Sequence, residues 1–454
     1  MKHNTGTLIN LFIPNRKTSR PLHPLPMGCL SLLAVLEKNR LFTKFYDYQF
    51  YAKRNPFDPA NIVALVEPNL QWLGISCLND MLPFACLAAD GVKKIYPHIT
   101  IILGGPGPTP VAEELLKTFS FIDVVVRGEG EETIVELVKQ IVEGKSRDFS
   151  NIKGIVYRAR TGEIISNPPR PRIKDLNTLP LPAFSKVDLH RYNSFSFMTT
   201  RGCPFRCAFC EVGNIWGQNV YRYSVTKVGE ILEYLYREHH IEKISFDDDN
   251  FVLDRNRVHS ICNELGKRNI KLTWNCLARV DAISLPLLKK MKEYGCEGIF
   301  YGIESGDNSV LSQIKSNVTV EQSVAVVYDT LEAQLNPTVS FIWGFPFENI
   351  NQFYKTLFLT IFFRLLGCQE RIALLSSCRG SPLYKKFGKK LCTDRTIMET
   401  NPNVSIKPIG KYNYQLVDLI LQYPQLFSSF YTYEHKDLRI KNEIMQKFMR
   451  WWPG

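Results

Sequence analysis

Short apolar runs with the composition of buried strands alternate with helical periodicity over most of this 454-residue chain. In the first third of the chain, the runs expected to be strands are 8–12, 73–77, 100–103 and 123–126. Helical spacing of apolar residues occurs between and after them, at 28–38, 84–96 and 131–142. Such alternation is typical of a parallel sheet covered by helices. Residues 1–145 are therefore predicted to form a doubly wound, Rossmann-like α/β domain that holds ligands at the carboxyl ends of its strands.

A proline-rich stretch separates this region from a second one of the same kind. Residues 146–195 contain a hairpin pattern at 154–158 and 162–165, and then Pro168, Pro169, Pro171, Pro180 and Pro182. Proline suits neither a central strand nor a helix interior, so this stretch is expected to be an extended linker. Alternation returns over residues 196–394, and residues 395–454 are expected to form a small C-terminal extension. The expected strands of the second region include 243–246, 272–276, 298–303, 338–343 and 373–378.

The bulk composition excludes several classes of protein. The longest apolar run, 357–363, is bracketed by Lys355 and Arg364 and is far too short to span a bilayer, so it is expected to be a buried helix. No secretory signal is expected at the N-terminus. Twelve cysteines without such a signal argue for free thiols in a reducing, cytoplasmic location and no membrane association.

The net charge of +12 has two interpretations. One is a generally basic surface, and the other is an acidic partner such as nucleic acid or an acidic precursor peptide. The basic residues are scattered and show no aromatic RNA-binding signature, so the first interpretation is favoured and nucleic acid is not expected as a partner.

Three cysteines within eight residues carry the clearest chemical signal. Cys203, Cys207 and Cys210 are spaced to ligate three irons of one [4Fe–4S] cluster, and no fourth cysteine follows nearby to close it. One iron is therefore left open to a ligand that is not protein. A structural zinc site is the alternative, but such a site has four protein ligands, usually in two pairs along the sequence. A second pair is missing here, and no histidine lies within the next 28 residues.

This motif resembles the signature of the radical S-adenosylmethionine (SAM) enzymes, including aromatic Phe209 directly before the third cysteine. The resemblance implies that the open iron binds SAM, which an electron from the cluster splits to a 5′-deoxyadenosyl radical. It further implies a partial (β/α)6 barrel over residues 196–394. An electron donor such as flavodoxin or ferredoxin is the implied partner.

Further positions match SAM contacts of that family. Glu304, with Gly302 and Ser305, lies in the sequence Gly-Ile-Glu-Ser-Gly, and Arg279 matches an arginine that reaches the SAM carboxylate. Asp248 lies in an Asp-Asp-Asp-Asn run where the family lines the SAM amino group. One or two residues of that run are expected to face the site, and the rest are expected to cap the next helix. The alternatives are a helix N-cap for Glu304 and a surface ion pair for Arg279.

The glycine-rich turns of the first region carry a second resemblance. The sequences ILGGPGPT, with Gly104 and Gly105, and VVVRGEGEET, with Gly128 and Glu129, are similar to the cobalamin-binding domain of B12-type radical SAM proteins. Cobalamin is therefore a possible further cofactor. The Asp-x-His-x-x-Gly motif that supplies an axial histidine in many cobalamin proteins is absent, and a retained fold without cobalamin is the alternative.

Cys378, expected at the end of the last barrel strand, is the candidate hydrogen-atom donor, with a buried core cysteine as the alternative. The chain resembles radical SAM peptide epimerases in domain order, length and this late cysteine. The favoured hypothesis is therefore Cα epimerisation of residues in a ribosomal precursor peptide. Two alternatives stay open. One is a cobalamin-dependent radical SAM methyltransferase acting on a peptide or natural product, and the other is a non-catalytic cobalamin- or redox-responsive binding protein.

Overall fold

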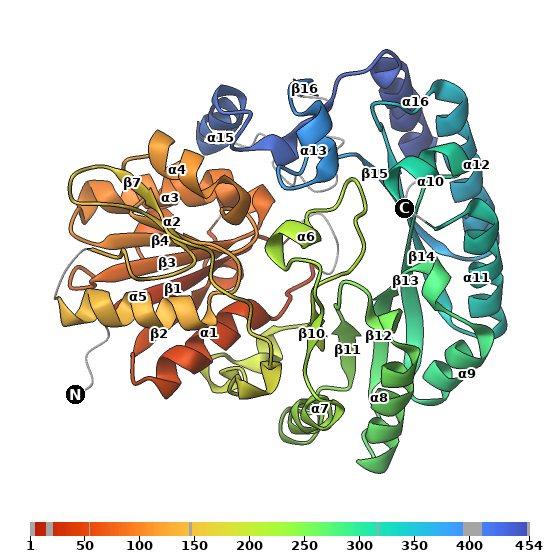
Figure 1. The fold of residues 1–454 in the computed structure, drawn as a ribbon, viewed down its shortest axis with the longest axis horizontal. Helices are drawn as coiled ribbons and strands as arrows, with labels where there is room; N and C mark the ends of the chain where they lie inside the picture. The colour runs from red at the N-terminus through yellow and green to blue at the C-terminus, as the bar shows by residue number, and fades with distance from the viewer. Residues whose placement is uncertain are drawn as a thin grey trace. The chain divides into compact units, whose positions relative to one another are not determined.

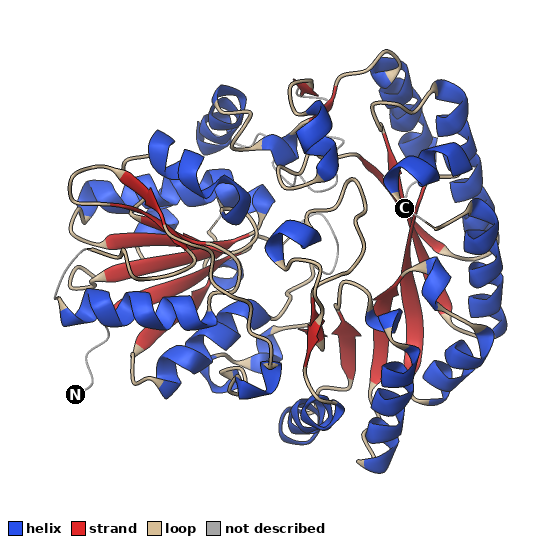
Figure 2. Ribbon diagram, in the orientation of Figure 1, coloured by secondary structure: helices blue, strands red, loops and turns tan. Residues whose placement is uncertain are grey.

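The computed structural model describes residues 5–14, 21–53, 55–144, 148–315, 317–393 and 411–451 (Figure 1). The chain divides into two compact units. The first comprises Met1–Lys174, Thr178–Asn193 and Ser405–Ser429, and the second comprises Asp175–Asn177, Ser194–Val404 and Phe430–Gly454. Each unit is built around its own main sheet with helices packed against it, as the colouring of Figure 2 shows. None of the helices in the described part of the chain is long and apolar enough to cross a bilayer.

The first unit contains a seven-stranded sheet in the order β2-β1-β3-β4-β5-β6-β7. Its parallel strands are β1 (Gly6–Leu11), β2 (Thr43–Asp47), β3 (Trp72–Cys77), β4 (Thr100–Gly104) and β5 (Val124–Val126). Its helices are α1 (Met27–Lys38), α2 (Pro59–Val63), α3 (Leu82–Ile95), α4 (Ala112–Thr118) and α5 (Glu131–Glu143). Figure 1 shows α1 and α5 on one face and α2, α3 and α4 on the other. The predicted doubly wound α/β fold is confirmed, and the strand order reverses between β1 and β3.

The hairpin expected in the linker is present but belongs to this sheet. β6 (Ile155–Arg158) pairs antiparallel with β5, and β7 (Ile164–Ser166) pairs with β6. The proline-rich stretch is also fastened to the first unit, because the Tyr192 hydroxyl donates to Asp47 Oδ2 at 3.0 Å. Residues 148–174 and 178–193 thus belong to the first unit, and they do not form an extended linker.

The second unit contains six parallel strands in the order β15-β14-β13-β12-β11-β8. They are β8 (Ser196–Phe197), β11 (Lys243–Phe246), β12 (Thr273–Ala278), β13 (Cys296–Glu304), β14 (Asn336–Trp343) and β15 (Gln369–Leu374). The helices of the unit are α6 (Val212–Ile215), α7 (Val225–His239), α8 (Arg255–Lys267), α9 (Leu285–Glu293), α10 (Asn308–Ile314), α11 (Val320–Glu332), α12 (Ile350–Leu365), α13 (Pro382–Phe387) and α16 (Leu438–Trp451). This open parallel sheet with its helices is the expected partial (β/α)6 barrel, whose functional residues gather at the carboxyl ends of the strands.

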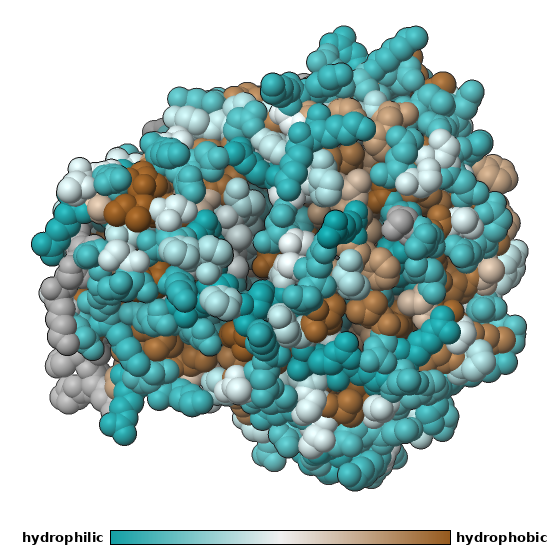
Figure 3. Space-filling model, in the orientation of Figure 1, coloured by the Kyte–Doolittle hydropathy of each residue, from teal (hydrophilic) through white to brown (hydrophobic). Residues whose placement is uncertain are grey.

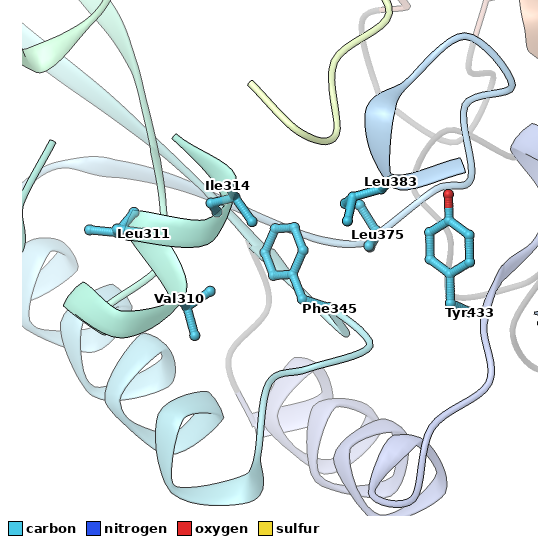
Figure 4. Close-up of a cluster of buried hydrophobic side chains, with 7 residues drawn as sticks. All are labelled: Val310, Leu311, Ile314, Phe345, Leu375, Leu383 and Tyr433. Atoms are coloured by element: carbon cyan, nitrogen blue, oxygen red, sulfur yellow. The ribbon is translucent and has the colours of Figure 1, made fainter. Parts of the chain in front are cut away.

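Two antiparallel pairs of short strands complete the second unit. β9 (Thr200–Arg201) pairs with β10 (Tyr221–Arg222), and β16 (Leu391–Cys392) pairs with β17 (Thr432–Tyr433). A buried cluster of Val310, Leu311, Ile314, Phe345, Leu375, Leu383 and Tyr433 lies beneath the later loops. In Figure 4 the Phe345 ring lies between Ile314 of α10 on one side and Leu375 and Leu383 on the other.

The C-terminal extension does not form one body. Helix α15 (Lys411–Gln422) belongs to the first unit, whereas α16 belongs to the second. Lys441 fastens α16 to the loop after β14, because its Nζ donates to Glu348 Oε2 at 3.0 Å and both side chains are fully buried. The backbone N–H of Gly344 donates to the same Glu348 oxygen at 3.0 Å.

Helix α12 is only half buried, contrary to the sequence prediction. Phe353 and Phe363 are fully buried, while Phe358 and Leu365 are 71% and 76% exposed. The helix covers one side of the sheet, so only one face of the apolar run is covered. On the side drawn in Figure 3 the surface is mostly hydrophilic, with apolar side chains in separate groups.

Candidate functional site

The cysteine loop, residues 203–210, follows β9 in the second unit and carries three half-buried thiols. The backbone N–H of Cys210 donates to the Cys207 carbonyl at 3.1 Å, and the N–H of Val212 donates to Cys210 Sγ at 3.4 Å. Burial raises the pKa of all three thiols, that of Cys210 to about 12. The thiols also raise one another's pKa, since neighbouring thiolates repel. The structure therefore brings the three cysteines together in one partly desolvated loop.

Arg279 lies directly after β12 and faces this loop. Its Nη1 donates to Cys207 Sγ at 3.7 Å, and its guanidinium stacks over the Phe205 ring at 3.7 Å. Its Nε and Nη2 donate to the two oxygens of Asp281 at 3.0 and 2.9 Å, a bidentate pair that fixes the guanidinium plane. The arginine is only 6% exposed, so the alternative of a surface ion pair is wrong.

Glu304 is the last residue of β13 and is also buried. Lys315 Nζ lies 3.7 Å from Glu304 Oε1 and donates to the Gly302 carbonyl. Burial raises the pKa of Glu304, and Lys315 and Arg279 oppose that rise. The alternative helix-cap role is wrong for Glu304, because Asp307 caps α10 by accepting from the N–H groups of Ser309 and Val310. A side chain at Gly302 would meet the Glu304 carboxylate, which would then have to move.

Lys315 was missed by the sequence prediction. It follows α10, and its side chain is only 4% exposed. After burial, its positive charge is the largest influence on the Cys207 thiol, whose pKa it lowers. Cys207, Arg279, Glu304 and Lys315 therefore form one charged cluster, called here the Cys207 cluster. No local sequence pattern predicts a functional role for this lysine, because its proximity to Glu304 arises only in the folded chain.

The aspartates that follow β11 have roles that differ from the predicted ones. Asp248 is fully buried and accepts from the Thr199 hydroxyl at 3.1 Å and from the backbone N–H of Thr200, so it fastens the start of β9 to the end of β11. Burial raises its pKa to about 6. Asp249 accepts from the Gly202 N–H at 3.3 Å, and its charge acts on Cys203 and Cys210. Asp248 therefore has a structural role, whereas Asp249 lies beside the cysteine loop.

The residues that follow the acidic run also differ from the prediction. The cap of the next α-helix, α8, is Asp254, which accepts from the Arg257 N–H at 3.1 Å, and not a member of the run. Asn250 Oδ1 accepts from the Arg279 N–H at 3.3 Å. The Asn250 Nδ2 group is buried and makes no hydrogen bond within the described residues, so it is available to a ligand beside Arg279.

Two other predicted contacts face the protein interior. Ser305 Oγ accepts from the Asp307 N–H at 3.2 Å and lies 3.3 Å from the Thr356 hydroxyl of α12, so it stabilises the turn into α10. Phe209 packs on the apolar cluster of Figure 4, with its ring centroid 6.4 Å from that of Phe345. Phe209 therefore anchors the cysteine loop to the barrel.

Cys378 is not at the end of a strand, because β15 ends at Leu374. It lies in the following loop, which packs on the cysteine loop. The N–H of Leu383 donates to the Ala208 carbonyl at 2.8 Å, and Asn214 Nδ2 donates to the Gly380 carbonyl. Burial raises the pKa of the Cys378 thiol, and the charges of Glu211 and Cys210 raise it further. The structure therefore places this thiol near Cys210.

The glycine-rich turns of the first unit lie at the carboxyl ends of β4 and β5. Gly105 has φ +98°, and a Cβ there would lie 2.7 Å from the Cys77 carbonyl oxygen. The Thr109 hydroxyl joins the two turns, because it donates to the Gly105 carbonyl at 2.8 Å and accepts from the Gly128 N–H at 3.4 Å. Gly104 has room beside it, with Val126 as its nearest neighbour at 3.9 Å.

Two carboxylates near these turns differ in whether they are available to bind a ligand. Glu129 accepts from the Ile173 N–H at 2.8 Å and from Arg172 Nε at 3.2 Å, so it holds the proline-rich stretch rather than a ligand. Asp80, which the sequence prediction missed, follows β3 beside the point where the strand order reverses. Its Oδ1 is buried without a hydrogen bond within the described residues, and burial raises its pKa to about 6.

Comparison with known proteins agrees with this arrangement. The radical SAM superfamily model matches residues 197–360, and the B12 binding domain model matches residues 18–138. The chain therefore contains a radical SAM domain, preceded in the sequence by a B12-binding domain.

Two curated relatives show what kinds of protein share this sequence. The chain is 32% identical over 305 residues to an uncharacterized methyltransferase of Pyrococcus horikoshii, covering 66% of this chain and 65% of the relative. It is 27% identical over 277 residues to the anaerobic magnesium-protoporphyrin IX monomethyl ester cyclase of Rubrivivax gelatinosus, covering 58% and 49%. The chain thus spans about half to just under two thirds of the length of these relatives. The predicted resemblance to peptide epimerases is not supported by these matches.

Two solved structures share the fold. The radical SAM methyltransferase TsrM of Kitasatospora setae, with cobalamin and a [4Fe–4S] cluster bound, superposes with a TM-score of 0.69 at 18% identity, covering 85% of this chain and 78% of TsrM. OxsB, a cobalamin-dependent SAM radical enzyme with aqua-cobalamin and SAM bound, gives 0.71 at 19% identity, covering 98% and 66%. At these identities the likeness shows the fold.

Proposed function

We propose that the chain is a cobalamin-dependent radical SAM methyltransferase that acts on a carbon centre of a small molecule or peptide. The observation that carries this proposal is the Cys207 cluster, a set of charged side chains around one of three gathered thiols, on a chain that also carries a B12-binding domain. A binding protein without catalysis would not need buried Arg279, Glu304 and Lys315 around a thiol, since burying charges is costly even when they form ion pairs. The methyltransferase relative and the methyltransferase TsrM support this hypothesis over epimerisation.

The residues of the second unit fit a [4Fe–4S] cluster with SAM. Cys203, Cys207 and Cys210 would supply the three thiolate ligands. The positive charges of Arg279 and Lys315 lower the pKa of Cys207 and so favour its thiolate form. The two cations also suit the carboxylate of SAM, while Glu304 suits its amino group or ribose hydroxyls. The unpaired Nδ2 of Asn250 is a further donor beside Arg279. The protein's task here is to hold, orient and shield, because the reactive chemistry belongs to the cofactors.

The first unit fits a large, flat ligand at the carboxyl edge of its sheet. A Cβ at Gly105 or Gly107 would approach the backbone carbonyl of Cys77 or Leu78 to 2.7 Å, so the turn after β4 packs tightly on the end of β3. Asp80 offers a buried carboxylate oxygen that has no partner within the described residues. When bound, a [4Fe–4S] cluster would supply the electron that cleaves SAM, and cobalamin would carry the methyl group that is transferred.

Label transfer would test the proposal without knowledge of the substrate. The protein would be reconstituted anaerobically with iron, sulfide and hydroxocobalamin, separated from free cobalamin, and given SAM with a deuterated methyl group under reducing conditions. We expect retained cobalamin that acquires the deuterated methyl group, and release of 5′-deoxyadenosine that is lost in Cys207→Ala. A protein that retains no cobalamin, or whose retained cobalamin acquires no deuterated methyl group, would contradict the methyltransferase assignment.

The same preparation would test epimerisation. With a precursor peptide in D2O, methyl transfer predicts a mass gain of one methyl group that requires cobalamin and survives Cys378→Ala. Incorporation of solvent deuterium that is abolished by Cys378→Ala would restore the epimerase hypothesis.

A further inference from the structure

The stretch from Arg371 to Thr393 is unusually basic. It contains six basic residues and no acidic one, although the chain as a whole carries 44 acidic residues. Five of these basic residues follow the last barrel strand, and we call them the basic segment: Arg379, Lys385, Lys386, Lys389 and Lys390. Four of the five lie on α13 or in the turn after it.

The lysines of the basic segment are exposed and carry uncompensated charge. Lys385, Lys386, Lys389 and Lys390 are all exposed, and none forms an ion pair with another described residue. Lys386 lies 5.2 Å from the Phe387 ring centroid, which keeps its ammonium group at the surface. Glu434 lies beside the basic segment, since its N–H donates to the Lys390 carbonyl, and Asp437 follows three residues later. Exposed Lys436 lies between these two acids, so the described residues around the basic segment keep a positive balance.

The basic segment is built directly onto the cysteine loop. The Leu383 N–H donates to the Ala208 carbonyl at 2.8 Å, between the second and third cluster cysteines. Asn214, four residues after Cys210, donates to the Gly380 carbonyl. Leu383 also belongs to the buried cluster of Figure 4. Phe209 of the cysteine loop packs against this cluster. A protein bound to these lysines would therefore stand next to the part of the barrel that holds the cysteines.

We propose that the basic segment is the docking surface for a small acidic electron-carrier protein that reduces the cluster. This inference rests on the proposed function, because a cluster that cleaves SAM reductively must receive one electron from outside for each cleavage. The carrier loses one electron and the cluster gains it, with no proton or group transferred. Positive charge beside the cysteine loop would steer an acidic partner to the one region from which that transfer is short.

Charge reversal tests this surface against a matched control. K385E/K386E and K389E/K390E each reverse two exposed lysines of the basic segment. K267E/K271E reverses two exposed lysines at the amino ends of the barrel strands, where α8 ends and the chain leads into β12. All three variants change the net charge equally, so a general charge effect would appear in each. Thermal unfolding would confirm that the variants fold like the wild type.

The probe is a reduced, acidic bacterial flavodoxin, added to the reconstituted protein at low and high salt. Binding is measured by calorimetry, and cluster reduction by stopped-flow absorbance. We expect the two basic-segment variants to bind flavodoxin and to be reduced by it at least tenfold more weakly at low salt, with the difference shrinking at high salt. K267E/K271E should behave like the wild type.

Reduction by dithionite separates this proposal from the proposed function. Dithionite needs no docking surface, so all variants should be reduced by it at wild-type rates. Equal flavodoxin binding and reduction in all variants, or an equal loss in K267E/K271E, would overturn the docking surface. A failure of cobalamin binding or methyl transfer would instead contradict the methyltransferase assignment and leave these measurements interpretable.

Discussion

Replacing Lys441 by methionine should release the C-terminal helix α16 from the barrel. Lys441 and Glu348 are fully buried, and the lysine Nζ contacts both the carboxylate and the backbone carbonyl of Glu348. Without the lysine, the carboxylate stays buried with the Gly344 N–H as its remaining donor. Removing one member of a buried ion pair typically costs about 3–5 kcal/mol. At about 1.4 kcal/mol for each factor of ten, the local opening of α16 should become about two to four orders of magnitude more frequent.

Amide hydrogen exchange followed by mass spectrometry measures this opening directly, because α16 can open without the whole chain unfolding. Peptides from Leu438–Trp451 should lose protection in Lys441→Met, whereas Lys447→Met, at an exposed position of the same helix, should change little. Combining Lys441→Met with Glu348→Leu should restore most of the protection, because both buried charges are then gone. A loss of less than tenfold in Lys441→Met would refute the reasoning.

Three further predictions concern the site. Gly105→Ala should lower the thermal stability of the first unit more than Gly162→Ala, by about 1–3 kcal/mol, because both have positive φ but only Gly105 is crowded by the Cys77 carbonyl. Lys315→Met should weaken SAM binding in equilibrium dialysis by about 10- to 100-fold, from the loss of a charge-assisted hydrogen bond, while iron content stays unchanged. Burial raises the Asp248 pKa from about 4 in the unfolded chain to about 6 in the folded chain. As pH rises between these values, the unfolded chain loses this proton more readily than the folded chain, so the free energy of unfolding falls. The wild-type apo-protein should therefore lose unfolding free energy relative to Asp248→Asn between about pH 4 and pH 6, with no further difference above that range; a difference that is constant across this range would contradict the shift.

Local sequence patterns predicted the features that depend on nearby residues. Strand–helix alternation predicted most of the parallel strands of the two sheets, and cysteine spacing located the loop beside which Arg279 and Glu304 lie. The direction of side chains after a strand ends is set by the loop conformation, so Asp248 could not be told from Asp249. Cys378 was misplaced for a similar reason, since β15 ends four residues before it.

Contacts between distant parts of the chain were beyond this reasoning. Lys315 reaches Glu304 only because α10 turns back over β13. The hairpin pattern at residues 154–166 was recognised, but its pairing with β5 depends on the edge that the finished sheet leaves open. The division of the C-terminal extension between two units likewise follows from packing partners that are far away in sequence.

The backbone of Glu304 has a consequence for how this protein tolerates mutation. Its φ of +74° lies in the left-handed region, which a residue with a side chain adopts only at a cost and glycine adopts freely. Its carboxylate is also buried. On both counts glycine at this position would suit the folded chain better. Variants selected only for folding should therefore become enriched in glycine at position 304, whereas variants selected for SAM cleavage should retain glutamate. The contrast between the two selections would measure how strongly the reaction, rather than the fold, determines this residue, before any substrate is known.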